Sequence, residues 1–245
     1  MTVCLDGHSL AIADVARVAR EDEPVAIARE SHAAMERSRA LVEARLREGA
    51  AVYGVNTGFG KFSDVVIDDA DVALLQRHLI VSCCTGVGEP LPVEVVRAML
   101  LLRANSLAAG DSGVRPLLVD GLVAMLNKGV HPVVPRKGSV GSSGDLAQLS
   151  HLALVLMGGG RAWYGGEELD GAEALHRAGI APVELQAKEG LSLCNGTQAM
   201  TALGALAVHD ARRLADAADV VGALTAEALE AVVAAFDERI HRSRP

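Results

Sequence analysis

Apolar residues recur at intervals of three and four along most of this 245-residue chain, and this spacing constrains its fold more than any other feature. Half of the residues are apolar, but only six are aromatic, so aliphatic side chains must fill the core. The spacing predicts helices over residues 10–20, 34–47, 92–108, 116–128 and 146–157, and another that follows Asp68 and runs to Cys83. We therefore predict a mainly α fold.

Glycine and proline mark the ends of these helices. Gly49 ends one helix, and an extended piece that includes Tyr53 follows it. Residues 131–135 must be extended, because each proline there disfavours helix in the residue before it. From Thr197 onward the spacing predicts two long helices with an interruption near Gly222.

A small hairpin is expected after the helix over residues 146–157. The glycine run 158–160 ends that helix. Two short segments, 161–164 and 167–169, then flank the glycine pair 165–166, which suits a tight turn.

The segment Gly-Ser-Val-Gly-Ser-Ser-Gly-Asp, residues 138–145, carries the most chemistry. The backbone nitrogen of Gly144 can attack the carbonyl carbon of Ser142 and close a five-membered ring, with loss of one water. Ser143 can then lose its hydroxyl as a second water and leave an exposed methylidene. Glycine permits the unusual dihedrals and the close approach that ring closure requires.

The same octapeptide has simpler interpretations. Glycine- and serine-rich loops also serve as flexible linkers or anion-binding nests, and Asp145 could simply cap a helix that starts at Leu146. On its own, the segment leaves these possibilities open.

Two further segments are Tyr-Gly-Val-Asn-Thr-Gly-Phe-Gly at residues 53–60 and Asn-Gly-Thr-Gln at 195–198. In order and in spacing from the 138–145 loop, they resemble the signature segments of the ammonia-lyases and aminomutases that carry a methylidene-imidazolone prosthetic group. The resemblance is closest to the histidine-specific members, and it continues through residues 86–91, 103–107, 112–116 and 188–191.

The resemblance implies a function as well as a fold. It implies a methylidene-imidazolone group formed from Ser142, Ser143 and Gly144, without any external cofactor or metal, to which the amine of an amino acid substrate adds. It implies that Tyr53 removes the β-proton and that Asn195 holds the prosthetic ring or the substrate amine. The products are ammonia and an α,β-unsaturated acid, which is urocanate when the substrate is L-histidine.

Both of the last two residues also have structural interpretations. Tyr53 could be a half-buried strand tyrosine, and Asn195 could be a turn residue before Gly196.

Three positions depart from the family pattern. Ser142 stands where alanine is usual, but only its backbone takes part in cyclisation, so we expect the ring to form. Ser82-Cys83 stands where histidine-specific members have Ser-His, and a thiol is a weak hydrogen-bonding group for a substrate imidazole. Phenylalanine or tyrosine lyase and aminomutase activities therefore stay open beside histidine lyase activity. Gln148 stands where proline is common, and we attach no mechanism to it.

The chain is about half as long as the family's members, so it resembles their N-terminal half. We expect residues 1–195 to form the prosthetic-group-bearing domain and residues 196–245 to begin a truncated central helical bundle. The family resemblance implies a homotetramer for the full-length protein. A catalytically silent fragment that acts as an interaction module is the alternative, and an apolar face along residues 199–235 should promote association.

Composition narrows the remaining function classes. The net charge of −8 gives no basic footprint for nucleic acid, and no apolar run reaches the roughly 18–20 residues that span a bilayer. The N-terminal 21 residues lack the pattern of a signal peptide. The four cysteines lack C-x-x-C spacing, which favours reduced thiols without a zinc site in a cytoplasmic enzyme.

The remaining ionisable side chains receive structural roles. His78, His151 and His209 lie on apolar-patterned helices without metal-ligand partners at the right spacing, so we expect them to pack or cap. Arg103 and Arg115 could bind a carboxylate, but structural ion pairs are the expectation for both.

Overall fold

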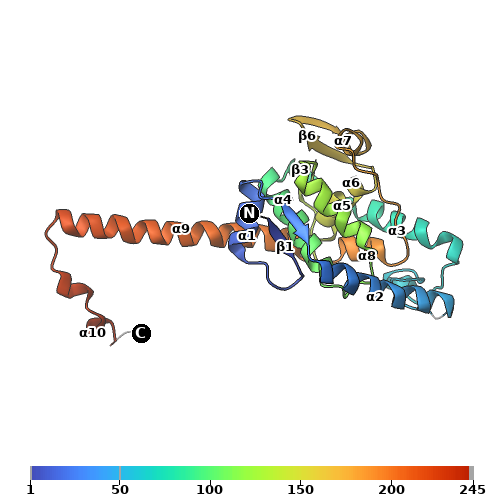
Figure 1. Cartoon of the computed structure of the whole chain (residues 1–245), viewed down its shortest axis with the longest axis horizontal. Helices are drawn as coiled ribbons and strands as arrows, with labels where there is room; N and C mark the ends of the chain where they lie inside the picture. The colour runs from blue at the N-terminus through green and yellow to red at the C-terminus, as the bar shows by residue number, and fades with distance from the viewer. Residues whose placement is uncertain (1, 50, 243–245) are drawn as a thin grey trace. The chain divides into compact units, whose positions relative to one another are not determined.

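The computed structural model describes residues 2–49 and 51–242, and helices dominate it (Figure 1). The helices of the first part of the chain are α1 (Ile12–Arg20), α2 (Arg29–Arg47), α3 (Asp69–Cys83), α4 (Val93–Ala108), α5 (Pro116–Asn127), α6 (Leu146–Leu156), α7 (Gly171–Arg177) and α8 (Glu189–Cys194). The predicted mainly α fold and six predicted helices are confirmed. α2 begins earlier than predicted, and α7 and α8 were not predicted.

The chain divides into two compact units between Leu206 and Ala207. The predicted domain boundary between residues 195 and 196 stays a prediction. The second predicted domain extends to Pro245, and its last residues, 243–245, lie outside the described part of the chain.

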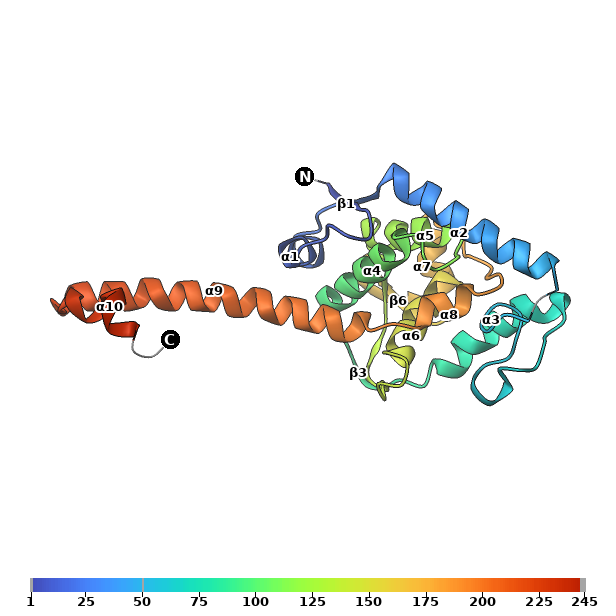
Figure 2. The ribbon, with the colours of Figure 1, turned by 90° about the horizontal axis from the view of Figure 1, so that it is seen from below.

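α4 lies at the centre of the first unit, where α1, α2 and α5 pack against it (Figure 2). Its apolar residues occur all around the helix, and Leu100 and Leu101 are fully buried. A helix that is hydrophobic on every side belongs in a core. Two buried arginines also lie on α4. Arg97 donates hydrogen bonds toward α1, and Arg103 donates toward α8.

Short strands tie the helices together. β1 (Val3–Leu5) pairs in parallel with β2 (Val25–Ile27), and β3 (Val87–Pro90) pairs antiparallel with β5 (Pro135–Lys137). A three-stranded sheet has the order β4 (His131–Pro132), β6 (Arg161–Tyr164) and β7 (Glu167–Asp170).

The predicted extended arm and hairpin are both confirmed. β4 and β5 occupy the proline-rich arm that leads into the 138–145 loop. β6 and β7 form the hairpin, and Gly165 and Gly166 both have positive φ, as a two-residue turn of this kind requires.

The second unit consists of the later turns of α9 (Gln198–Ala228), a 3-10 turn at Val233–Phe236 and α10 (Glu238–His241). The predicted break near Gly222 is wrong, because α9 runs through this glycine without interruption. A glycine inside a helix costs only about 1 kcal/mol relative to alanine, and the good helix formers around it outweigh that cost.

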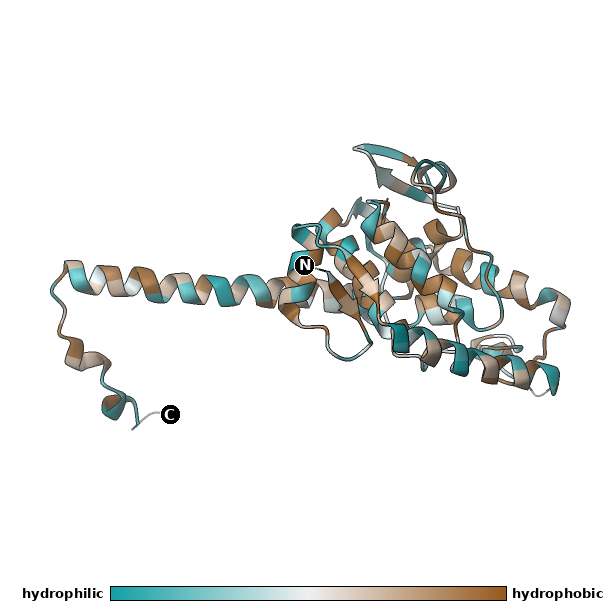
Figure 3. Cartoon of the chain, in the orientation of Figure 1, coloured by the Kyte–Doolittle hydropathy of each residue, from teal (hydrophilic) through white to brown (hydrophobic). Residues whose placement is uncertain are grey.

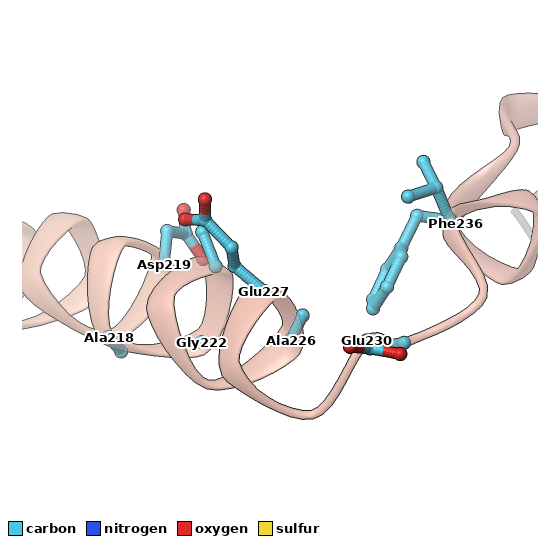
Figure 4. Close-up of a pocket in the computed structure, with 10 residues that line it drawn as sticks. Ala218, Asp219, Gly222, Ala226, Glu227, Glu230 and Phe236 are labelled. Atoms are coloured by element: carbon cyan, nitrogen blue, oxygen red, sulfur yellow. The ribbon is translucent and has the colours of Figure 1, made fainter.

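Apolar side chains of the second unit are largely exposed. Brown and teal residues alternate along α9 in Figure 3, and Leu214, Val221 and Leu224 are each 60% exposed or more. A pocket of about 600 Å³ lies in this unit, between the end of α9 and Phe236 (Figure 4). None of the predicted site residues lines it.

Candidate active site

The 138–145 loop bends sharply through Ser142, Ser143 and Gly144. Ser143 has a φ of 60° and Gly144 a φ of 113°. The left-handed region costs a non-glycine residue about 1–2 kcal/mol, so the surroundings must hold Ser143 there. Ser142 and Ser143 are exposed, whereas Gly144 is partly buried.

Gly144 is seated against the backbone of the Asn195–Gln198 segment. A Cβ at Gly144 would overlap the carbonyl oxygen of Gly196. The same oxygen accepts a hydrogen bond from the backbone nitrogen of Asp145, 2.6 Å away. Position 144 therefore has to be glycine, and the bent part of the loop rests on the segment that carries Asn195.

Asp145 ties the loop to α9. One carboxylate oxygen accepts a hydrogen bond from Ser139 Oγ at 3.0 Å, and the other accepts one from the backbone nitrogen of Met200 at 2.8 Å. Asp145 precedes α6, but its side chain makes no capping bond to that helix. The interpretation of Asp145 as a simple cap of α6 is therefore wrong, since its carboxylate satisfies the first turn of α9 and closes the loop on itself.

Asn195 follows directly after α8, and both the start and the end of this short helix are fixed. At its start, Gln76 Oε1 on α3 accepts hydrogen bonds from the backbone nitrogens of Gly190 at 2.9 Å and Leu191 at 3.3 Å. At its end, Arg103 donates to the backbone oxygen of Asn195 at 3.0 Å. The Asn195 side chain is exposed.

The start of α8 also holds a buried ion pair. Glu189 is fully buried, and Arg115 donates to its two carboxylate oxygens at 2.8 and 2.7 Å. The structural ion pair expected for Arg115 is confirmed, but the one expected for Arg103 is wrong. Within the described part of the chain no carboxylate pairs with Arg103, and its partners are neutral oxygens.

Tyr53 lies in a turn rather than in the extended piece that was predicted. Its side chain is 55% exposed and makes an edge-to-face contact with Phe59, with ring centroids 6.2 Å apart. The interpretation as a half-buried strand tyrosine is therefore wrong. A Cβ on the next residue, Gly54, would lie 2.5 Å from Leu191 Cδ2, so the turn packs closely on α8.

Ser82 and Cys83 end α3. Ser82 is exposed and donates to the backbone oxygen of Leu79 at 2.9 Å, while Cys83 is half-buried. Burial raises the pKa of Cys84 and of Cys194 to about 12, and the neighbouring Cys83 thiol adds to both shifts. α3 and α8 pack against each other, as the bond between Gln76 and Gly190 also shows.

The chain just beyond α3 reaches the entry of the loop. Gly86 donates to Nε2 of His151 at 3.2 Å, and a Cβ on Gly138 would lie 3.0 Å from the Gly86 Cα. His151 therefore has the structural role expected of it, and the loop begins beside the segment that follows Cys83.

The structure thus brings three predicted regions together: the Ser142–Gly144 bend, the segment that carries Asn195 and the end of α3. The turn with Tyr53 packs on α8, but in the described residues no hydrogen bond joins Tyr53 to the loop. The sequence interpretation missed two contacts: the bond from Met200 to the Asp145 carboxylate, and the packing of Gly144 on the Gly196 carbonyl. Asp145 and Gly196 both lie inside the quoted motifs, at 138–145 and 195–198, and that position was the available signal.

The local backbone fits a prosthetic group formed from residues 142–144. Ser143 is left-handed, Gly144 has no room for a Cβ, and the Ser143 hydroxyl that would be eliminated is on an exposed side chain, so the local geometry is compatible with cyclisation. Among residues 2–49 and 51–242, no three His, Cys, Asp or Glu side chains are grouped so that they could hold a metal ion. The described helices include none that is both long and apolar enough to cross a membrane.

Comparisons with known proteins identify the family of this chain. The family model for aromatic amino acid lyases matches residues 10–245. Histidine ammonia-lyase from Gloeobacter violaceus is 58% identical over 241 residues, which are 98% of this chain and 47% of that protein. The chain thus spans about half the length of the curated relatives it matches.

Two solved structures have the same fold over their corresponding halves. Histidine ammonia-lyase from Trypanosoma cruzi has a TM-score of 0.93 and 40% identity, covering 100% of this chain and 48% of its own. Phenylalanine aminomutase from Pantoea agglomerans has a TM-score of 0.92 and 37% identity, covering 100% of this chain and 47% of its own. The chain belongs to the aromatic amino acid lyase family.

Proposed function

We propose that this chain is the prosthetic-group-bearing half of an ammonia-lyase that converts L-histidine to urocanate and ammonia. The observation that carries the proposal is the seating of the Ser142–Gly144 bend against Gly196, which leaves no room for a side chain at position 144 and holds the bend with positive φ at Ser143 and Gly144. The similarity to histidine ammonia-lyases supports the choice of substrate.

In this proposal, residues 142–144 form a methylidene-imidazolone group autocatalytically, with no external cofactor. A bond forms between the Gly144 nitrogen and the Ser142 carbonyl carbon, and two waters leave, one from that carbonyl and one from Ser143. When formed, the group supplies an electrophile to which the substrate amine adds, which makes nitrogen a better leaving group.

The other residues bind the substrate and move its proton. Tyr53 Oη, on an exposed side chain, accepts the β-proton of the substrate as a phenolate and becomes the neutral phenol. The amide of Asn195 has both a donor and an acceptor, and it holds the substrate amine or the prosthetic ring. Ser82 and Cys83 contact the substrate side chain from the end of α3. Asn195 follows a helix that the buried Gln76 and Arg103 hold in place, which favours precise positioning of its amide.

A second candidate activity rests on Cys83. A half-buried thiol offers the substrate ring an apolar contact rather than a strong hydrogen bond, which suits phenylalanine or tyrosine as well as histidine. The similarity to phenylalanine aminomutase adds the possibility that the amine returns to the β-carbon. A silent fragment that acts as an interaction module is the non-enzymatic alternative.

The full-length protein is proposed to be a cytoplasmic homotetramer. The exposure of Tyr53, Ser143 and Asn195 supports that view, since other segments or subunits must exclude water from the proposed reaction.

A substrate panel tests the activity. The chain, alone and mixed with the C-terminal half of a homologous lyase, is incubated with L-histidine, L-phenylalanine and L-tyrosine, and products are separated by liquid chromatography. We expect urocanate from histidine in the mixed sample, and none from a matched Ser143→Ala variant. A β-amino acid product would favour an aminomutase, and no product from any substrate would contradict the enzyme proposal.

A further inference from the structure

Arg103 is a buried cation behind the candidate site, and the function proposed above gives it no part. It is 3% exposed and lies on α4, the central helix of the first unit. Burial lowers its pKa to about 10, so it stays protonated at neutral pH. Keeping a charge in such a place is costly unless its hydrogen bonds are well made.

The bonds of Arg103 join two helices. Nη1 donates to the backbone oxygen of Ser192 at 2.9 Å, inside α8, and Nη2 donates to that of Asn195 at 3.0 Å, just after it. Nη2 also donates to Oε1 of Gln198, the first residue of α9. One planar guanidinium thus fixes the turn between α8 and α9, where Gly196 lies.

The contact continues from this turn to the loop. A Cβ at Gly196 would overlap the Nη2 atom of Arg103, and a Cβ at Gly144 would overlap the Gly196 carbonyl oxygen. Arg103, Gly196 and Gly144 are therefore stacked in direct succession. The absence of side chains at both glycines lets the guanidinium support the backbone that faces the loop.

We propose that Arg103 is the positioning residue for the Ser142–Gly144 bend, because it fixes the α8–α9 turn so that the Gly196 carbonyl seats Gly144 for cyclisation. The same bond to Asn195 sets where the exposed amide of that residue is presented. Arg103 itself touches neither of the serines, so its action is indirect. The proposal rests on the proposed function only in taking cyclisation as the process that is positioned.

The chain offers a matched control in Arg97, on the same helix. Arg97 is 4% exposed, and its guanidinium donates to the backbone oxygens of Val18 at 2.7 Å and Leu126 at 3.2 Å. It also pairs with Asp22 at 3.0 Å. Replacing either arginine by methionine removes a buried guanidinium with its backbone bonds, but only one of the two supports the loop.

The test compares Arg103→Met, Arg103→Lys and Arg97→Met with the unchanged chain. Intact mass with peptide mapping gives the fraction that has lost two waters at residues 142–144, and hydrogen exchange of the 138–148 peptide gives the order of the loop. A misplacement of about 1 Å can slow a positioned reaction on the order of 100-fold. We therefore expect Arg103→Met to accumulate unmodified chain with faster exchange in the loop, while Arg97→Met keeps both properties of the unchanged chain.

The cyclised fraction and loop exchange of Arg103→Lys should lie between those of Arg103→Met and the unchanged chain. A lysine ammonium can reach one acceptor but cannot bridge three. Gln198→Met removes one acceptor and leaves the arginine in place, so it gives a milder variant should Arg103→Met fail to fold. It is expected to raise loop exchange by a smaller factor.

Equal cyclisation and equal loop exchange in Arg103→Met and the unchanged chain would overturn the proposal. An equal loss in Arg97→Met would overturn it too, because the effect would then be general destabilisation. An unchanged chain that shows no water loss would count against the proposed function, and hydrogen exchange would then decide the role of Arg103 alone.

Discussion

The two compact units differ in the exposure of their large apolar side chains. The unit that ends at Leu206 buries a continuous aliphatic core around α4, with Leu100, Leu101 and Leu107 fully buried. The unit that begins at Ala207 leaves large apolar side chains such as Leu214 and Leu224 exposed. The first unit thus has a buried apolar core of its own, whereas the second has an exposed apolar surface of the kind that promotes association.

Within the first unit, the side chains that anchor segments and those proposed for the chemistry also differ in exposure. Asp145 and Glu189 are buried and hold their segments by several bonds each. Tyr53, Ser143 and Asn195, which carry the proposed chemistry, are exposed. In this half the anchoring side chains are thus buried, while the side chains of the proposed chemistry are open to water.

The largest expected effect is on stability. Leu101→Ala in α4 should lower the free energy of unfolding by about 2–5 kcal/mol, because a fully buried leucine leaves a cavity. Leu214→Ala, at a side chain that is 72% exposed, should change it by no more than about 0.5 kcal/mol. Urea unfolding followed by circular dichroism measures both. Equal losses in the free energy of unfolding would contradict the difference between the two units.

The next effect is on association. Leu214, Val221 and Leu224 follow helical spacing on α9 and are exposed. Replacing all three with glutamine should shift the chain from associated to smaller species in sedimentation velocity, with little change in the unfolding of the first unit. A clean monomer for the unchanged chain would contradict the prediction, as no association would remain to be lost.

A smaller effect is expected from acid. Burial lowers the pKa of His131 to about 4, Arg97 adds to the lowering, and Asp22 opposes it. Between pH 4 and the ordinary histidine value of about 6.5, the unfolded chain binds more protons than the folded one, so stability should fall as pH decreases through this range.

His131→Gln should flatten the loss of stability measured by urea titrations at pH 7 and pH 5. His151, whose pKa burial also lowers, contributes in the same direction and keeps some of the slope. An unchanged slope in His131→Gln would show that other groups set the acid sensitivity.

The last prediction concerns the labelling rates of the thiols, and it involves no change in the stability of the chain. Burial raises the pKa of Cys84 and Cys194 to about 12, so few thiolates form there at neutral pH. In native protein both should react far more slowly with iodoacetamide than the exposed Cys4. Peptide mapping after a timed reaction measures each site, and comparable labelling of all three would indicate that the core of the first unit opens readily.

The sequence predicted the elements that local periodicity determines. Helices with strong apolar spacing, such as α1, and the hairpin around Gly165 could be predicted because neighbouring residues carry the signal. The break near Gly222 was wrong because a single glycine is a weak signal among strong helix formers.

What the sequence could not reveal depends on contacts between distant segments. Arg103 was expected to form an ion pair, yet its partners are the backbone oxygens of Ser192 and Asn195 and the side-chain oxygen of Gln198. Asp145 was taken as a candidate cap of its own helix, but it caps α9 instead. Backbone carbonyls carry no sequence signal, so only the fold shows which of them a buried side chain meets.

The central claim is that residues 142–144 cyclise in this chain, and the mass of the intact, purified protein tests it most directly. The account predicts a mass lower than the sequence mass by two waters, with the loss mapped to the peptide that contains Ser142, Ser143 and Gly144. A matched Ser143→Ala variant, which has no hydroxyl to eliminate at that position, should not show the full loss. The full sequence mass in the unchanged chain would contradict the account.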